Sequence, residues 1–166
     1  MTTPQLPATQ RYIKAPPFLL GMEYAELFNH ENLFLVVGAT NNEEKYGSKV
    51  FRDLKQAGYN VVAINKRGGV IQGTPAYPSV TAFLDRVAKL FSEEKRRETI
   101  AKIILVLVVP PEAALQVIEE AAGLGVRRAW FQPGAESEEA LAYCAEHGLA
   151  VVQGQCIMVR RPRADA

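Results

Sequence analysis

The chain reads Leu33-Phe34-Leu35-Val36-Val37-Gly38-Ala39-Thr40 where an apolar run stops at a glycine and opens into a polar loop. The loop continues as Asn41-Asn42-Glu43-Glu44-Lys45-Tyr46-Gly47-Ser48, and an amphipathic stretch follows it. A buried strand, a glycine turn and a helix N-terminus together form a place that can bind phosphate. The loop lacks the G-x-G-x-x-G spacing, which weakens the usual dinucleotide interpretation.

Apolar segments alternate with stretches of helical spacing along the rest of the chain. The apolar segments predicted as strands are 33–37, 60–64, 103–109, 126–131 and 149–152. Such strands, apolar throughout and separated by helices, are typical of a parallel sheet that is covered on both faces. The pattern therefore predicts an α/β fold, a Rossmann-like doubly wound parallel sheet of about five strands with helices on both faces.

The predicted helices carry apolar residues at helical spacing and end in glycine. Their apolar faces are Val50, Phe51, Leu54 and Ala57; Val80, Phe83, Leu84, Val87 and Phe91; Ala114, Val117, Ile118 and Ala121; and Leu141, Cys144 and Ala145. Gly58, Gly125 and Gly148 follow three of them, where glycine accepts the left-handed conformation of a helix end. The polar segment 92–99 is predicted as a solvated helix end or loop.

The length of 166 residues and the apolar content of 48% predict a single domain, over residues 21–166. Residues 1–20 contain four prolines and are predicted as an extended arm, and residues 22–29 as a short helix. The net charge of +1 gives no basic excess that points to nucleic acid. The longest apolar run, 103–109, is too short to span a bilayer.

Cys144 and Cys156 lack C-x-x-C spacing and are expected to be reduced thiols, while His30 and His147 lack zinc-site spacing. No metal site and no catalytic residue is predicted. The N-terminus has no apolar core of a secretory signal and is a poor transit peptide. The expected location is cytoplasmic, with a mitochondrial one left open.

The loops after the strands are the expected ligand site, because ligands of open parallel sheets bind outside the carboxyl ends of the strands. Asn65-Lys66-Arg67 follows the second strand, where an NAD site would carry an acidic residue for the ribose hydroxyls. Two cations there suit a phosphate on or near the ribose. NADP, with a 2′-phosphate, and coenzyme A, with a 3′-phosphate, both satisfy this test, whereas NAD is disfavoured.

At these loops the chain resembles the small stand-alone CoA-binding domain proteins, which are similar to the N-terminal CoA-binding domain of the succinyl-CoA synthetase α subunit and of related acyl-CoA synthetases. The matching stretches are V-V-G-A-T-N-N-E-E-K-Y-G-S, N-V-V-A-I-N-K-R-G-G, A-Y-P-S-V, W-F-Q-P-G-A-E-S-E-E-A and C-I-M-V. They run in order from about residue 31 to 160. The resemblance implies a Rossmann-like fold and CoA or an acyl-CoA as the ligand. The Asn-Pro-Lys that is common in the family reads Asn65-Lys66-Arg67 here.

The resemblance also implies which residues bind the coenzyme. The loop that would hold the diphosphate is Gly38, Ala39, Thr40, Asn41 and Asn42, and the helix start that would face it is Lys45, Tyr46, Gly47 and Ser48. The basic loop would be Asn65, Lys66 and Arg67, with Arg67 at the 3′-phosphate. The segments that would line and close the site are Val109 and Pro110, and Phe131, Gln132 and Pro133.

The resemblance favours CoA binding without catalysis by this chain. Two alternatives stay open: an NADP-binding, oxidoreductase-like protein, and the CoA-binding subunit of an acyl-CoA ligase that needs a partner chain. In the ligases a phosphorylated histidine on a second domain does the chemistry, and neither His30 nor His147 lies in a suitable loop. The expected partner is a small nucleotide ligand, with a homodimer or an unidentified protein partner left open. Cys156 is expected to pack beyond the last strand on the ligand side, and a sharper hypothesis pairs it with the CoA thiol in a mixed disulfide.

Overall fold

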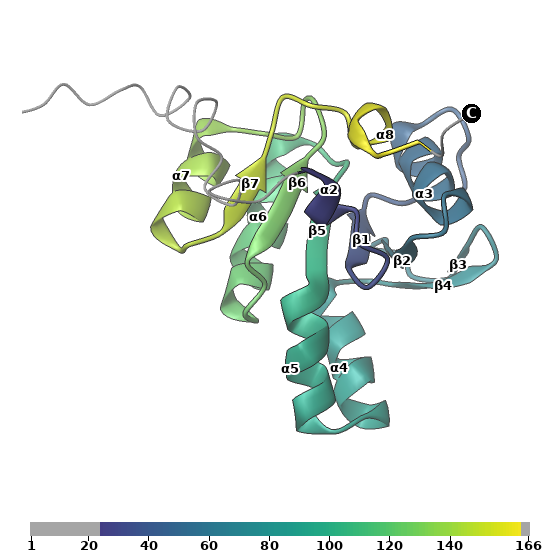
Figure 1. The fold of residues 1–166 in the computed structure, drawn as a ribbon, viewed down its shortest axis with the longest axis vertical. Helices are drawn as coiled ribbons and strands as arrows, with labels where there is room; N and C mark the ends of the chain where they lie inside the picture. The colour runs from purple at the N-terminus through teal and green to yellow at the C-terminus, as the bar shows by residue number, and fades with distance from the viewer. Residues whose placement is uncertain (1–23, 164–166) are drawn as a thin grey trace, which may run out of the picture.

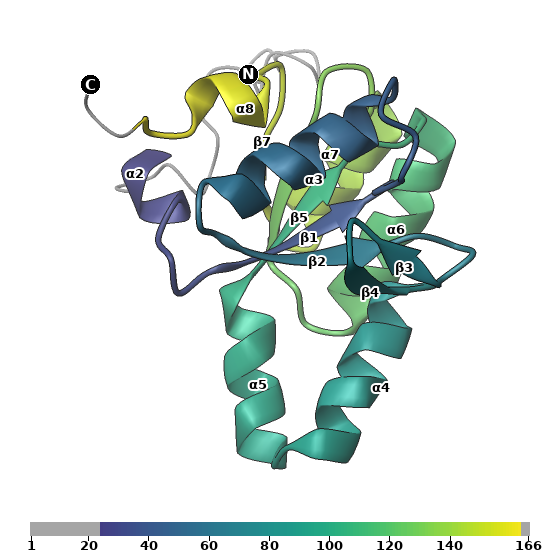
Figure 2. The same cartoon turned by 90° about the vertical axis from the view of Figure 1, so that its right-hand side faces the viewer.

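The computed structural model describes residues 24–163, in which seven strands form one sheet with helices on both faces (Figures 1 and 2). The strands are β1 (Leu33–Val37), β2 (Asn60–Ile64), β3 (Val70–Ile71), β4 (Thr74–Tyr77), β5 (Ile103–Leu107), β6 (Arg128–Phe131) and β7 (Ala150–Val152). Their order in the sheet is β3-β4-β2-β1-β5-β6-β7, and every neighbouring pair is parallel except β3 and β4. Without β3, this is the 3-2-1-4-5-6 order of the Rossmann fold.

All five predicted strands are present and parallel, so the predicted fold class is confirmed. The predicted number of strands was wrong, because the β3–β4 hairpin adds two. Its turn is Gln72-Gly73, and both residues have positive φ, 48° and 79°, as two-residue hairpins of this kind require. β3 has only two residues and β4 contains Pro75, so neither has the pattern of a strand.

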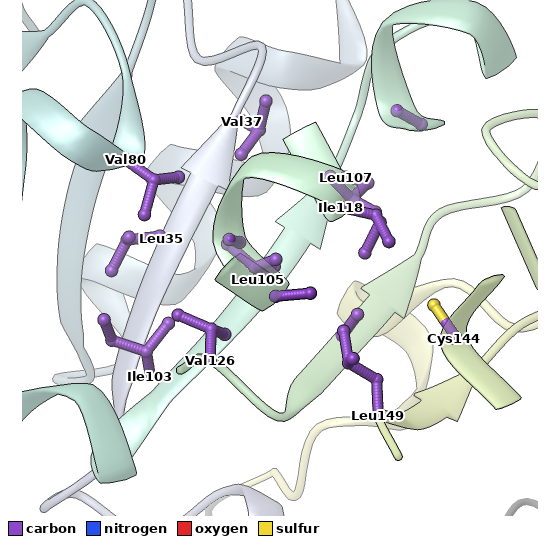
Figure 3. Close-up of a cluster of buried hydrophobic side chains, with 14 of the residues drawn as sticks. Leu35, Val37, Val80, Ile103, Leu105, Leu107, Ile118, Val126, Cys144 and Leu149 are labelled. Atoms are coloured by element: carbon purple, nitrogen blue, oxygen red, sulfur yellow. The ribbon is translucent and has the colours of Figure 1, made fainter. Parts of the chain in front are cut away.

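The helices are α2 (Tyr24–Leu27), α3 (Tyr46–Gln56), α4 (Val80–Leu90), α5 (Glu93–Lys102), α6 (Pro111–Gly123), α7 (Glu138–Glu146) and α8 (Ile157–Arg160). One core cluster packs α4, α6 and α7 against alternate residues of β1 and β5, such as Leu35 and Leu105 (Figure 3). A second cluster packs α2, α3 and α8 against the other face, through Phe34 and Ile104. The central strands are therefore buried on both sides, as their continuous apolar sequences predicted.

The segment 92–99 lies mainly in helix α5, which corrects the prediction of a helix end or loop. Ser92 caps this helix by accepting a hydrogen bond from the backbone N–H of Lys95. No residue of α5 is buried, so the apolar periodicity that reveals other helices is missing. Together α4 and α5 project beyond the sheet as a hairpin (Figures 1 and 2). Phe91, predicted on the apolar face, lies just after α4 and is 55% exposed.

Helix α2 and the glycines at the helix ends agree with the sequence predictions. The short helix predicted over residues 22–29 is present as α2, and the predicted arm over residues 1–20 lies outside the described part. Gly58, Gly125 and Gly148 all have positive φ, as predicted for helix ends. None of the helices within residues 24–163 combines the length and the apolar character that crossing a bilayer requires.

Candidate functional site

A cleft of about 1000 Å³ opens at the carboxyl ends of the parallel strands. It lies where β1 and β5 are neighbours, which is the point at which the chain order of the strands reverses. Open α/β sheets bind their ligands at this switch point. The cleft is large enough for a cofactor.

Most of the predicted binding residues line this cleft. They are Gly38, Thr40, Asn42, Lys45, Tyr46, Gly47, Asn65, Lys66, Arg67, Val109, Pro110, Gln132 and Pro133. The lining also includes four residues outside the predicted set, Val108, Gly134, Ala135 and Cys156. Val108, Gly134 and Ala135 lie within two residues of predicted segments, so extending each loop by a residue or two would have found them. Cys156 was expected on the ligand side and lies there.

Four predicted residues do not line the cleft. Ala39 and Phe131 are buried in the two core clusters. The Asn41 side chain donates a hydrogen bond to the carbonyl of Val70 and accepts one from the backbone N–H of Gln72. The Ser48 hydroxyl, fully buried, accepts a hydrogen bond from the Gln72 side chain at 3.2 Å. Asn41 and Ser48 therefore tie the glycine loop and α3 to the β3–β4 hairpin.

Two glycines allow the backbones around the cleft to touch. Gly38 has φ +98°, and a Cβ there would lie 2.2 Å from the carbonyl oxygen of Val108. A Cβ on Gly47 would lie 1.9 Å from the carbonyl oxygen of Gly38. No side chain fits at either position. The first turn of α3 therefore packs directly on the glycine loop, and the loop packs directly on the end of β5.

The helices that start at the cleft lack the side-chain caps found on other helices. Ser79, Ser92 and Ser137 cap α4, α5 and α7, each through a hydrogen bond from a backbone N–H of the first turn. Lys45 and Pro110 begin α3 and α6 without a side-chain cap, and both residues line the cleft. Helix N-termini carry partial positive charge and unpaired N–H groups. These two ends make the cleft suitable for an anionic group.

The cleft also carries three basic side chains, Lys45, Lys66 and Arg67. All three are exposed, and none is in a salt bridge within residues 24–163. Asn65 fixes the loop that presents the last two, since its amide donates to the carbonyl of Ala39 at 2.8 Å and its oxygen accepts from the N–H of Arg67 at 2.8 Å. The cations are thus held beside the glycine loop and remain available to a phosphate.

A second, smaller cleft of about 390 Å³ adjoins the first on the side of β2 and β4. The two share several lining residues, among them Gly38, Lys66 and Pro110. Ile64 and Val117 contribute apolar surface to the second cleft. An extended ligand anchored at Gly38 would therefore find room on both sides.

At the other end of the main cleft, Gln132 contacts the C-terminal part of the chain. The Gln132 side chain is 5% exposed, its oxygen accepts from the N–H of Ile157 at 2.7 Å, and its nitrogen donates to Sγ of Cys156 at 3.4 Å. Cys144 differs from Cys156 because it is fully buried on α7, and burial raises the pKa of its thiol to about 12. Within residues 24–163, no group of three or more His, Cys, Asp or Glu side chains is placed to hold a metal ion.

The family model of the CoA binding domain matches residues 32–162, which include every residue that lines the two clefts. The chain belongs to the CoA binding domain family. The resemblance of the loops to this family is thereby confirmed, together with the Rossmann-like fold.

Several solved structures are similar along most of their length. A conserved hypothetical protein from Pyrococcus furiosus is 35% identical, with a TM-score of 0.63, and the match covers 79% of this chain and 99% of that one. A hypothetical protein from Pyrococcus horikoshii is 27% identical, with a TM-score of 0.64 and coverage of 84% and 89%. A Thermus thermophilus protein is 26% identical, with a TM-score of 0.64 and coverage of 83% and 96%. These relatives consist almost entirely of the part that matches this chain.

Proposed function

We propose that this protein binds coenzyme A or an acyl-CoA in the cleft at the β1–β5 switch point, without catalysis by this chain. The observation that carries the proposal is the contact of Gly47 on Gly38, which brings an uncapped helix N-terminus to the glycine loop of a CoA binding domain. A diphosphate bound there would accept hydrogen bonds from backbone N–H groups and gain from the helix dipole. Thr40 and Asn42, which line the cleft, would flank it.

The two sides of this anchor suit the two ends of CoA. The second cleft would take the adenosine, and Lys66 and Arg67 would pair with its 3′-phosphate. The pantetheine arm would run the other way, across β5 toward Gln132 and Cys156. β6 and β7 lie two and three strands from β1, which is about 10 and 14 Å. An extended arm spans such a distance.

The test is a thermal-shift panel of CoA, acetyl-CoA, NADP, NAD and ADP. A ligand at about 100 times its Kd stabilises the folded state by about 2.7 kcal/mol. For a chain of this size each kcal/mol raises the Tm by about 2–4 °C, so CoA should raise it by about 5–11 °C. NAD should have no comparable effect. A larger shift with NADP than with CoA would overturn the assignment.

Two lysine variants distinguish CoA binding in the cleft from general attraction of the CoA phosphates to a basic surface. Lys66→Ala should reduce the CoA shift, because it removes a cation from the wall of both clefts. Lys89→Ala removes an exposed lysine from α4, outside the cleft lining, and should leave the shift unchanged. Equal effects of the two substitutions would contradict the proposed site. Recovery of acetyl-CoA intact after incubation tests the absence of catalysis.

A further inference from the structure

The segment from Gln153 to Arg161, here called the C-terminal strap, runs back from the edge strand β7 to helix α3 at the other side of the molecule (Figures 1 and 2). It leaves the carboxyl end of β7, so it crosses the same edge of the sheet as the cleft. Cys156, in the middle of the strap, lines the cleft. The strap therefore contributes Cys156 to the lining of the site.

Two residues, Trp130 of β6 and Gln132 just after it, anchor the strap. The indole N–H of Trp130 donates to the carbonyl of Gln155 at 2.9 Å. The Gln132 side chain accepts from the N–H of Ile157 at 2.7 Å. Both anchors lie within a residue of Cys156, so they fix its position from the β6 side.

The third anchor is an ion pair at the far end of the strap. Arg161 donates two hydrogen bonds to the Asp53 carboxylate on α3, from Nε at 2.5 Å and from Nη2 at 2.9 Å. The two side chains are only 13% and 21% exposed. The other ion pair of α3, Arg52 with Glu43, has a single contact at 3.4 Å and exposures of 39% and 81%. A two-pronged, shielded pair fixes geometry far better than a single exposed one.

Neither Asp53 nor Arg161 lines either cleft, so the pair acts through the strap and not on the ligand. Helix α3 does not depend on it, because Val50, Phe51 and Leu54 hold that helix in the core with no exposed surface. Ile157, which is fully buried, and the two anchors on the β6 side would stay in place. Loss of the pair would therefore loosen the α3 end of the strap while leaving the phosphate end of the cleft in place.

We propose that Asp53 and Arg161 are a positioning pair that holds the strap against the pantetheine arm of CoA, and that the pair sets the affinity for this arm but not for the adenosine phosphates. The inference rests on the proposed CoA site. In this role two residues that do not line either cleft select pantetheine-bearing ligands over nucleotides that lack the arm.

The test compares two ligands in calorimetric titrations, CoA and adenosine 3′,5′-bisphosphate, which lacks the pantetheine arm. Arg161→Gln and Asp53→Asn should each lower the affinity for CoA by about tenfold, which lies within the range of coupling energies measured for residues in contact. The bisphosphate should bind each variant within about twofold of the unsubstituted protein, which also shows that the variants are folded. The double variant should lose no more CoA affinity than either single variant. Arg161→Lys keeps the positive charge but loses the two parallel hydrogen bonds to the carboxylate, so its CoA affinity should lie between those of the unsubstituted protein and Arg161→Gln. The matched control, Arg52→Gln, should bind both ligands normally.

The outcomes separate this inference from the proposed function. Unchanged CoA affinity in Arg161→Gln and Asp53→Asn, or an equal loss for both ligands, would overturn the positioning role while CoA binding stands. Failure of the unsubstituted protein to bind CoA would overturn the proposed function and this inference with it.

Discussion

The contact of α3 on the glycine loop makes Gly47→Ala an informative substitution. In an ordinary helix, alanine in place of glycine gains about 0.5–1 kcal/mol. Here the new methyl group would lie 1.9 Å from the Gly38 carbonyl oxygen and 2.9 Å from its carbon. Both atoms belong to the backbone, so the loop or the helix must move by about 1 Å. Such overpacking costs about 1–3 kcal/mol.

The balance is a net loss of about 1 kcal/mol of folding stability, which lowers the Tm by about 2–4 °C. CoA affinity should fall more steeply, by tenfold or more, because the displaced backbone is the proposed diphosphate site. Urea unfolding and calorimetric titration measure the two effects on the same samples.

Gly123→Ala is the matched control, since Gly123 ends α6 and a Cβ there meets no atom within 4 Å. It should gain up to about 1 kcal/mol from helix propensity alone and bind CoA normally. If Gly47→Ala is stabilised like Gly123→Ala and keeps its CoA affinity, the close contact does not constrain the site and the reasoning is refuted.

Three further substitutions test single residues. Arg67→Ala should weaken CoA about tenfold more than it weakens 3′-dephospho-CoA in calorimetric titrations, because a charged hydrogen bond to the extra phosphate is lost; equal losses would remove Arg67 from that role. Burial raises the pKa of Cys144 from 9.0 to about 12, so above pH 9 the unfolded state releases a proton that the folded state keeps. Between pH 8 and 10 the unsubstituted protein should therefore lose about 1 kcal/mol more stability than Cys144→Ala in urea unfolding, and parallel pH profiles would contradict this. Mild oxidation in the presence of CoA should add one CoA to Cys156, seen as a mass increase that a reductant reverses; a protein that shows no such adduct, or that shows it equally in Cys156→Ser, would exclude the mixed disulfide.

The sequence predicted the centre of the fold because its signal there is local. Leu33–Val37 and Ile103–Leu107 are apolar at every position, and such short runs between helical stretches are typical of strands that are covered on both faces. The β3–β4 hairpin was not predicted because its two strands have only two and four residues and because Pro75 interrupts the second strand. Helix α5 escaped because none of its residues is buried, so its formation depends on capping and charge rather than on an apolar face.

The loops of the site were predictable for a topological reason. Parallel strands bring all their carboxyl ends to one edge, so the loops that follow them must meet whatever their sequences are. The exceptions depend on contacts between distant parts of the chain. Asn41 and Ser48 were expected at the ligand, but their partner Gln72 lies in the hairpin that the sequence did not reveal. The strap likewise depends on Arg161 meeting Asp53, 108 residues earlier.

The missing G-x-G-x-x-G has a structural explanation in two glycines set farther apart. In the dinucleotide motif, one glycine allows the tight turn and another allows the helix to pack closely on the strand. Gly38 meets the first requirement, with its positive φ and its approach to β5, and Gly47 meets the second. The longer loop between them is held by its own side chains, since Thr40 accepts from the N–H of Asn42, and Asn42 accepts from the N–H of Glu44. The tight turn and the close helix packing of the dinucleotide motif are thus present here at a different spacing. A search for the short motif misses them, whereas a search for glycines that no Cβ can replace would find them.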